Sequence, residues 1–112
     1  MQVILNADDF GRSASINAAV IQAHREGVLT SASLMVTGDA LEEAVALACA
    51  TPTLSVGLHV VVAGERAALP PAQIPHLVDR SGRLHGSPEW IGMRYVLSRT
   101  AQQELARELA AQ

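Results

Sequence analysis

An acidic hexapeptide near the start of the chain reads Asn6-Ala7-Asp8-Asp9-Phe10-Gly11. It follows the apolar run at residues 3–5, which is typical of a buried β-strand. We therefore expect the two carboxylates in a polar turn beyond the carboxyl end of that strand, where α/β proteins place their ligand sites. Neighbouring Asp side chains repel each other unless a cation or a shared proton lies between them. A divalent metal site is one interpretation, and an ordinary Asn-Asp-Gly turn is the other.

A second candidate ligand, His59, lies near the end of another apolar segment, residues 54–60. Neutral imidazole binds zinc and other transition metals, whereas carboxylates bind harder ions as well. A lone His on a strand is also a common hydrogen-bonded core residue. If three parallel strands pair in chain order, the first and third lie about 10 Å apart, because neighbouring strands are roughly 4.8 Å apart. Asp and His side chains from these strands can then reach one ion.

Extended and helical patterns alternate over the first sixty residues. Ser13 is the expected N-cap of a helix that stops at Gly27. A second strand is expected over residues 32–36, and Asp39 with Glu42 matches a capping box for the next helix. The resulting β-α-β-α-β order predicts an α/β fold whose parallel strands are joined by right-handed crossovers.

The alternation stops after the third strand. Residues 61–86 are rich in Pro and Gly and are expected to form an irregular excursion, either a lid or a solvated connection. Residues 87–112 are expected to be helical, with Ser87 as the first N-cap and a second helix starting at Thr100. Three strands cannot close a barrel, so the chain resembles the front part of a larger fold.

Composition excludes several classes of function. The 112 residues carry a net charge of −3, with eight Arg and no Lys, and the scattered basic residues indicate no nucleic-acid surface. The single Cys49 cannot form an internal disulfide and is expected to be a small buried residue on a helix. No apolar run is long enough to span a membrane, and Met1 leads straight into a strand, so a cytoplasmic protein is expected. His24, His76 and His85 are expected to be structural or surface residues.

Three segments, in this order, resemble the signatures of YdjC-like carbohydrate deacetylases. They are residues Leu5–Gly11, Leu29–Val36 and Val56–His59. The Pro-containing segment Val60–Leu84 resembles the branch associated with hopanoid biosynthesis. The resemblance extends over nearly the whole chain, and the order of the motifs makes it specific.

This resemblance implies a TIM-barrel-like (β/α) fold that removes N-acetyl groups from amino sugars with a divalent metal, magnesium or zinc. By position in the motifs, Asp8 would be the general base, Asp9 the first metal ligand and His59 the second. The family's third metal-binding His lies in a later motif, beyond Gln112. Such barrels need about 250 residues. We therefore expect residues 1–112 to be a single incomplete barrel domain whose activity alone is in doubt.

Other interpretations were weighed against this one. A response-regulator receiver also has an acidic pair after its first strand, but it needs an Asp after the third strand and a Lys after the fifth; here His59 stands there and Lys is absent. A non-catalytic interaction module and another metal-dependent barrel hydrolase remain alternatives. Substrate-binding residues and the general acid are not assigned. An uncovered sheet edge and apolar helix faces predict a homo-oligomer.

Overall fold

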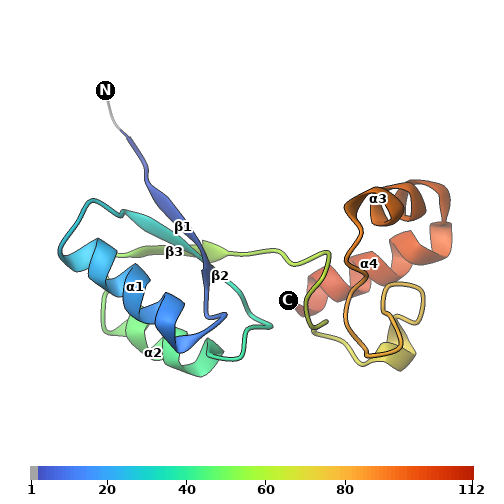
Figure 1. Cartoon of the computed structure of the whole chain (residues 1–112), viewed down its shortest axis with the longest axis horizontal. Helices are drawn as coiled ribbons and strands as arrows, with labels where there is room; N and C mark the ends of the chain where they lie inside the picture. The colour runs from blue at the N-terminus through green and yellow to red at the C-terminus, as the bar shows by residue number, and fades with distance from the viewer. Residues whose placement is uncertain (1–2) are drawn as a thin grey trace. The chain divides into compact units, whose positions relative to one another are not determined.

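Three short strands form a parallel sheet in the order β1-β2-β3, as the sequence pattern predicts. The computed structural model describes residues 3–112. The elements of the sheet region are β1 (Asn6–Phe10), α1 (Ala14–Arg25), β2 (Ser31–Leu34), α2 (Leu41–Cys49) and β3 (Ser55–Leu58). Each helix therefore links two neighbouring parallel strands (Figure 1).

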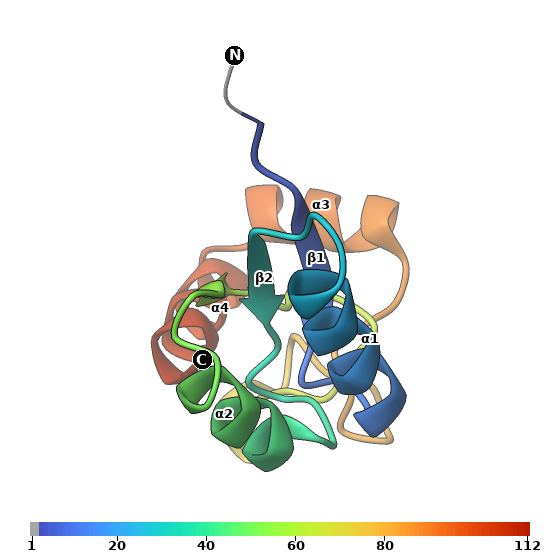
Figure 2. The ribbon, with the colours of Figure 1, turned by 90° about the vertical axis from the view of Figure 1, so that its left-hand side faces the viewer.

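Both helices lie on the same face of the sheet (Figures 1 and 2). The apolar core fills the space between this face and the helices, and its buried members are Phe10, Val20, Ile21, Ala32, Ala44 and Leu54. Sequential parallel strands with both helices on one face occur in the opening of a (β/α) barrel and in one half of a doubly wound sheet.

The first strand begins later than the sequence predicts. β1 starts at Asn6, so the acidic pair lies within the strand and not in a turn after it, while the apolar residues 3–5 precede the strand. The reason is the register: Asn6 pairs with Ser31, the first residue of β2. A strand can form only where its neighbour provides hydrogen-bonding partners. The Leu5 carbonyl accepts hydrogen bonds from the Thr30 and Ser31 N–H groups at 3.1 Å, but no residue of the run 3–5 has a register partner in β2.

The two helix starts of this region have different causes. The Ser13 hydroxyl accepts a hydrogen bond from the Ile16 N–H, which confirms the predicted cap of α1. The predicted capping box at Asp39 is wrong, because α2 has Ala40 at its N-cap position and no side-chain cap. The Ala40 N–H instead donates to the Gly11 carbonyl at 2.9 Å. A backbone contact with the loop after β1 thus fixes the start of α2.

Two further expectations concern the surface. Cys49 is exposed at the end of α2, so the prediction of a buried thiol is wrong. Among residues 3–112, no helix combines the length and the apolar character needed to cross a lipid bilayer.

The chain divides into two compact units, Met1–His59 and Val60–Gln112. The second unit contains a 3₁₀ helix (Pro71–Gln73), α3 (Pro88–Leu97) and α4 (Arg99–Ala111). α4 starts one residue before the predicted Thr100, since the Ser98 hydroxyl caps it by accepting from the Ala101 N–H. The proposed single barrel domain over residues 1–112 stays a prediction.

Residues 61–86 hold few regular elements, yet they supply much of the core of the second unit. The buried apolar residues of this segment are Val61, Ala67, Ile74, Leu77, Val78 and Leu84. Two isolated antiparallel bridges, Arg66–Arg83 and Val78–Leu84, close the segment on itself. It is therefore a packed part of the second unit and not a solvated connection.

Two buried glutamates of α4 hold this segment. Glu108 accepts hydrogen bonds from the N–H groups of Ala68 and Leu69, at 2.7 and 2.9 Å. Glu104 accepts from the N–H of His76 at 2.8 Å and contacts its ring Nδ1 at 2.6 Å. Both carboxylates are almost completely buried. They satisfy backbone groups for which an irregular segment offers no ladder partner.

Candidate functional site

A β-bulge lies at the acidic pair. Ala7 pairs with Ala32 and Phe10 pairs with Leu34, so β1 has one more residue than β2 between these pairs. Asp9 adopts a left-handed backbone conformation with φ of 62°, which is uncommon for a residue other than glycine. In a regular strand, Asp8 and Asp9 would point to opposite faces. The bulge breaks this alternation and re-aims the carboxylates, as bulges beside functional sites do.

The structure brings Asp9 and His59 together. The His59 Nε2 lies 3.6 Å from the Asp9 Oδ1, and the two side chains are 27% and 34% exposed. His59 directly follows β3, and its N–H donates to the Leu34 carbonyl at 2.8 Å, which continues the β2–β3 ladder by one residue. Residues fifty positions apart thus meet at the carboxyl ends of β1 and β3, as the parallel chain-order arrangement predicts.

The ring of His59 also touches the backbone of its partner. The Asp9 N–H donates to the His59 Nδ1 at 3.4 Å, so Nδ1 is the unprotonated nitrogen and Nε2 carries the proton that faces the carboxylate. Both contacts are long for hydrogen bonds, so they hold the ring loosely. A cation at Nε2 would take the place of that proton.

The pair fits a divalent metal in type and proximity. A carboxylate oxygen and an imidazole nitrogen are both zinc ligands, and each side chain keeps solvent-accessible surface. A catalytic zinc normally has three protein ligands. Within residues 3–112, no three His, Cys, Asp or Glu side chains cluster closely enough to hold a metal ion. Among the described residues, Asp9 and His59 are thus a pair of suitable side chains and not a complete three-ligand site.

Arg12 was not identified from the sequence. Its Nη1 lies 3.0 Å from the Asp9 Oδ2, so the two oxygens of this carboxylate face different partners, Arg12 and His59. Arg12 lies in the turn after β1, and the contact spans only three residues. An Asp-x-x-Arg spacing is too common to single out this residue from sequence alone.

Asn17 and two glycines fix the loops next to the pair. The buried Asn17 side chain accepts from the Gly11 N–H at 2.8 Å and donates to the Ala40 carbonyl at 3.0 Å. A Cβ on Gly38 would lie 2.2 Å from the Gly11 carbonyl oxygen, so only glycine fits there. These contacts tie the loop after β1 to the loop after β2. The sequence signal was a polar residue at a position of α1 that faces the core.

Asp8 has a different environment from Asp9. It is exposed, and its Oδ1 accepts a hydrogen bond from the Asn6 Nδ2 at 3.0 Å. The structure thus joins Asp9 and His59 directly, while Asp8 is held by a residue of its own strand.

The other histidines have structural partners. His24 contacts the Leu29 carbonyl and the Thr53 hydroxyl, both at 2.8 Å, which confirms its expected structural role. His76 is exposed and pairs with Glu104. His85 packs edge-on against Trp90 with ring centroids 4.4 Å apart.

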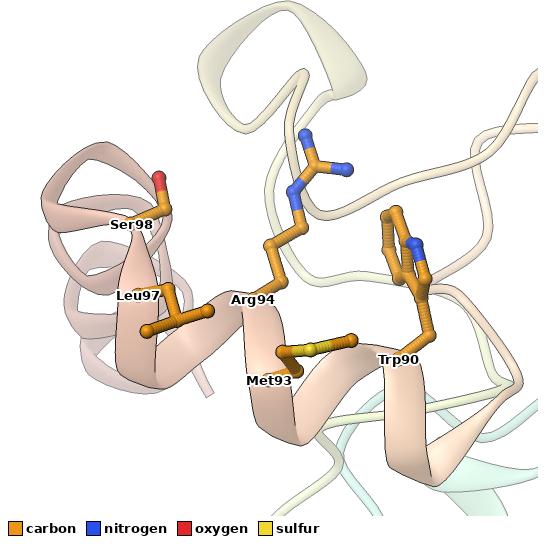
Figure 3. Close-up of a pocket in the computed structure, with 5 residues that line it drawn as sticks. All are labelled: Trp90, Met93, Arg94, Leu97 and Ser98. Carbon is orange, nitrogen blue, oxygen red and sulfur yellow. The ribbon is translucent and has the colours of Figure 1, made fainter.

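The second unit has an exposed hollow of about 360 Å³ on α3. Its lining residues are Trp90, Met93, Arg94, Leu97 and Ser98 (Figure 3). The Arg94 guanidinium lies 4.5 Å from the centre of the Trp90 ring, a cation–π arrangement. This contact covers part of the ring face that a sugar would stack on. We assign no substrate-binding role to the hollow.

Comparison with known proteins identifies the family. The chain is 43% identical over its whole length to a carbohydrate deacetylase of Brevibacillus brevis, of which it covers 42%. It is 41% identical over 98% of its length to a chitooligosaccharide deacetylase of Klebsiella pneumoniae, of which it covers 41%. The chain thus spans about two fifths of the length of these relatives.

A solved structure agrees with this grouping. A protein of Enterococcus faecalis V583, named for cellobiose-phosphate cleavage, is 30% identical and superposes with a TM-score of 0.84. The match covers 97% of this chain and 41% of that protein. The sequence model of the family described as YdjC-like protein matches residues 2–112. The chain therefore belongs to the YdjC-like protein family.

Proposed function

We propose that the chain provides the first part of a metal-dependent hydrolase that removes N-acetyl groups from amino sugars or their oligomers. The observation that carries the proposal is the meeting of Asp9 and His59 at 3.6 Å. Family membership and relatives named carbohydrate deacetylase and chitooligosaccharide deacetylase support the reaction and the substrate class.

The proposed fold is the opening of a (β/α) barrel. Sequential parallel strands with both helices on one face are the arrangement that curls into such a barrel. In barrels the catalytic residues gather at the carboxyl ends of the strands. Asp9 at the end of β1 and His59 after β3 match that placement.

Asp9 and His59 would hold the ion through a carboxylate oxygen and a ring nitrogen. When bound, a divalent ion polarises the acetyl carbonyl and lowers the pKa of water towards about 7. Asp8, whose exposed carboxylate lies one residue from Asp9, would accept a proton from the attacking water. Arg12 balances part of the negative charge of Asp9. A residue outside the described part of the chain would supply the third ligand, and the ion would be zinc or magnesium.

The proposal extends to the substrate, the location and self-association. A hopanoid-linked amino sugar is proposed as the substrate from the resemblance of the Pro-containing segment Val60–Leu84 to the hopanoid-associated branch. A cytoplasmic location is proposed from the sequence, in which no apolar run is long enough to span a membrane. Self-association is supported by exposed apolar side chains on α3, where Met93, Val96 and Leu97 are 59%, 75% and 77% exposed.

A chimera tests the proposed function. This chain would replace the matching 113 residues of the Brevibacillus brevis deacetylase, whose remaining residues would complete the fold. Acetate release from N-acetylglucosamine oligomers is then measured with zinc and with magnesium. We expect the chimera to be active, and Asp8→Asn to abolish acetate release while the metal content stays nearly unchanged.

The same experiment separates the alternatives. A folded chimera that binds metal but releases no acetate would favour a non-catalytic interaction module. Release of phosphate or of another amine, and not of acetate, would favour a different barrel hydrolase. Loss of metal in Asp8→Asn would mean that the roles of Asp8 and Asp9 are reversed.

A further inference from the structure

Asn6 is the centre of a hydrogen-bonded ladder across β1 and β2. Its side-chain Oδ1 accepts from the Ser31 hydroxyl at 2.8 Å. Its Nδ2 donates to the Ser33 hydroxyl oxygen at 2.9 Å and to the Asp8 Oδ1 at 3.0 Å. The core cluster of the first unit includes none of these four residues. Four polar side chains of two strands are thus connected through one amide.

The chemistry of the partners fixes the orientation of the amide. A carboxylate only accepts hydrogen bonds, so the Asn6 side chain must present its nitrogen to Asp8. The opposite orientation would place the amide oxygen against the carboxylate oxygen. With this orientation, the Ser31 hydroxyl donates to the amide oxygen. Both N–H bonds of the amide are used, one for each strand.

The hydrogen bond from Asn6 orients Asp8, which lies beside the bulge. Asp8 precedes a residue with a left-handed backbone and lies on the exposed part of β1, so packing does not fix its side chain. A charge-assisted hydrogen bond from Asn6 is the contact that orients it. Because Asn6 bonds only one carboxylate oxygen in this structure, the Oδ2 stays available to accept a proton.

We propose that Asn6 is a positioning residue for Asp8, and that Ser31 and Ser33 hold Asn6 in the orientation this requires. The proposal rests on the proposed function only where it gives Asp8 the role of base. The geometric part, that Asn6 fixes the Asp8 side chain, stands on the hydrogen bonds alone.

The decisive test measures the Asp8 side chain in this chain by NMR. Three-bond couplings from the carboxylate carbon of Asp8 to the backbone nitrogen and carbonyl carbon report its χ1 angle. We expect one rotamer in the unsubstituted chain and averaged couplings in Asn6→Ala. Ser33→Ala should cause a smaller change, since the bond from the amide to Asp8 remains. Ser55→Ala is the matched control, because Ser55 pairs with Ser31 in the sheet but lies on β3.

Kinetics of the same substitutions in the chimera provide a second readout. Asn6→Ala should lower kcat about 10-fold and change KM less than about twofold, because it misaligns a base and removes no substrate contact. Asn6→Asp should lower kcat further, since it places a second carboxylate against Asp8. Ser55→Ala should leave both parameters unchanged.

The outcomes for the two proposals are separable. Asp8 couplings that are identical in the unsubstituted chain, Asn6→Ala and Ser33→Ala would overturn the positioning role, whatever the activity of the chimera. An unchanged kcat in Asn6→Ala would overturn the part of the proposal that gives this positioning a role in catalysis. A chimera without deacetylase activity would count against the proposed function, and the couplings would still decide the role of Asn6.

Discussion

The two units of the chain satisfy their polar groups in different ways. In the first unit, β1, β2 and β3 pair in a ladder, and the core cluster is formed by apolar side chains such as Phe10 and Ala44. In the second unit, residues 61–86 form few ladder contacts, and the carboxylates of Glu104 and Glu108 accept from their backbone N–H groups. Strand pairing thus satisfies backbone groups of the sheet, whereas buried carboxylates satisfy several backbone groups of residues 61–86.

The two units also differ in which of their acidic side chains can reach a substrate. Glu104 and Glu108 are buried and engaged with the backbone, so they cannot act on a substrate. Asp8, Asp9 and His59 keep solvent-accessible surface at one end of a regular sheet. Each unit should therefore lose stability when its own kind of contact is removed.

The largest loss of stability is expected from Phe10→Ala in the first unit. Phe10 is fully buried in the core cluster, so the substitution should cost about 3–5 kcal/mol of unfolding free energy. Urea denaturation measures the loss, and amide hydrogen exchange should show lost protection over β1 and β2. Phe10→Leu is the control and should cost much less. A loss below about 1 kcal/mol for Phe10→Ala would mean that apolar packing does not hold this unit together.

A somewhat smaller loss is expected from Glu108→Ala in the second unit. The substitution leaves the N–H groups of Ala68 and Leu69 without their acceptor, which should cost about 3 kcal/mol. Hydrogen exchange should accelerate at these two amides and not in β1 or β2. Gln103→Ala, at an exposed position of the same helix, should be nearly neutral. Equal effects of both substitutions would contradict the role of the buried carboxylate.

The smallest of the three effects is expected from Gly38→Ala. The new Cβ would overlap the Gly11 carbonyl oxygen, so the loops beside the acidic pair must separate, at a cost of about 2 kcal/mol. Gly57→Ala is the matched control in the same unit, since a Cβ there meets no atom within 4 Å. Chemical-shift changes at Asp9 and Arg12 should accompany Gly38→Ala only. Their absence would show that the two loops are independent.

The sequence predicted the parallel chain-order sheet because helix caps and apolar runs are local signals. Ser13 followed by an amphipathic segment is enough to define α1. The first strand was expected at residues 3–5, but β1 starts at Asn6. The start of a strand depends on its partner, and Asn6 is the first residue with a register partner in β2. Local apolarity does not contain that information.

In the candidate site, too, some features could be predicted from the sequence and others could not. The residue types of Asp9 and His59 pointed to a metal, and the strand order brought them together. The bulge at Asp9 arises from the pairing of β1 with β2, which local sequence does not encode. The Arg12–Asp9 and Asn6–Asp8 contacts are local, but such short spacings are too common to single them out. The sequence also did not predict that residues 61–86 are packed in the second unit. A Pro-rich composition does not reveal that Glu108 accepts hydrogen bonds from the backbone of this segment.

We propose that Asp9 of β1 and His59 after β3 supply two of the three protein ligands of one metal site. Titration of the chain with zinc by calorimetry, compared with Asp9→Ala, His59→Ala and Asp8→Asn, tests it most directly. We predict binding weaker than about 1 μM for the unsubstituted chain, because catalytic sites normally have three protein ligands. We predict that Asp9→Ala and His59→Ala each abolish this binding and that Asp8→Asn retains it. Submicromolar affinity of the monomer, or unchanged binding without Asp9 or His59, would contradict the account.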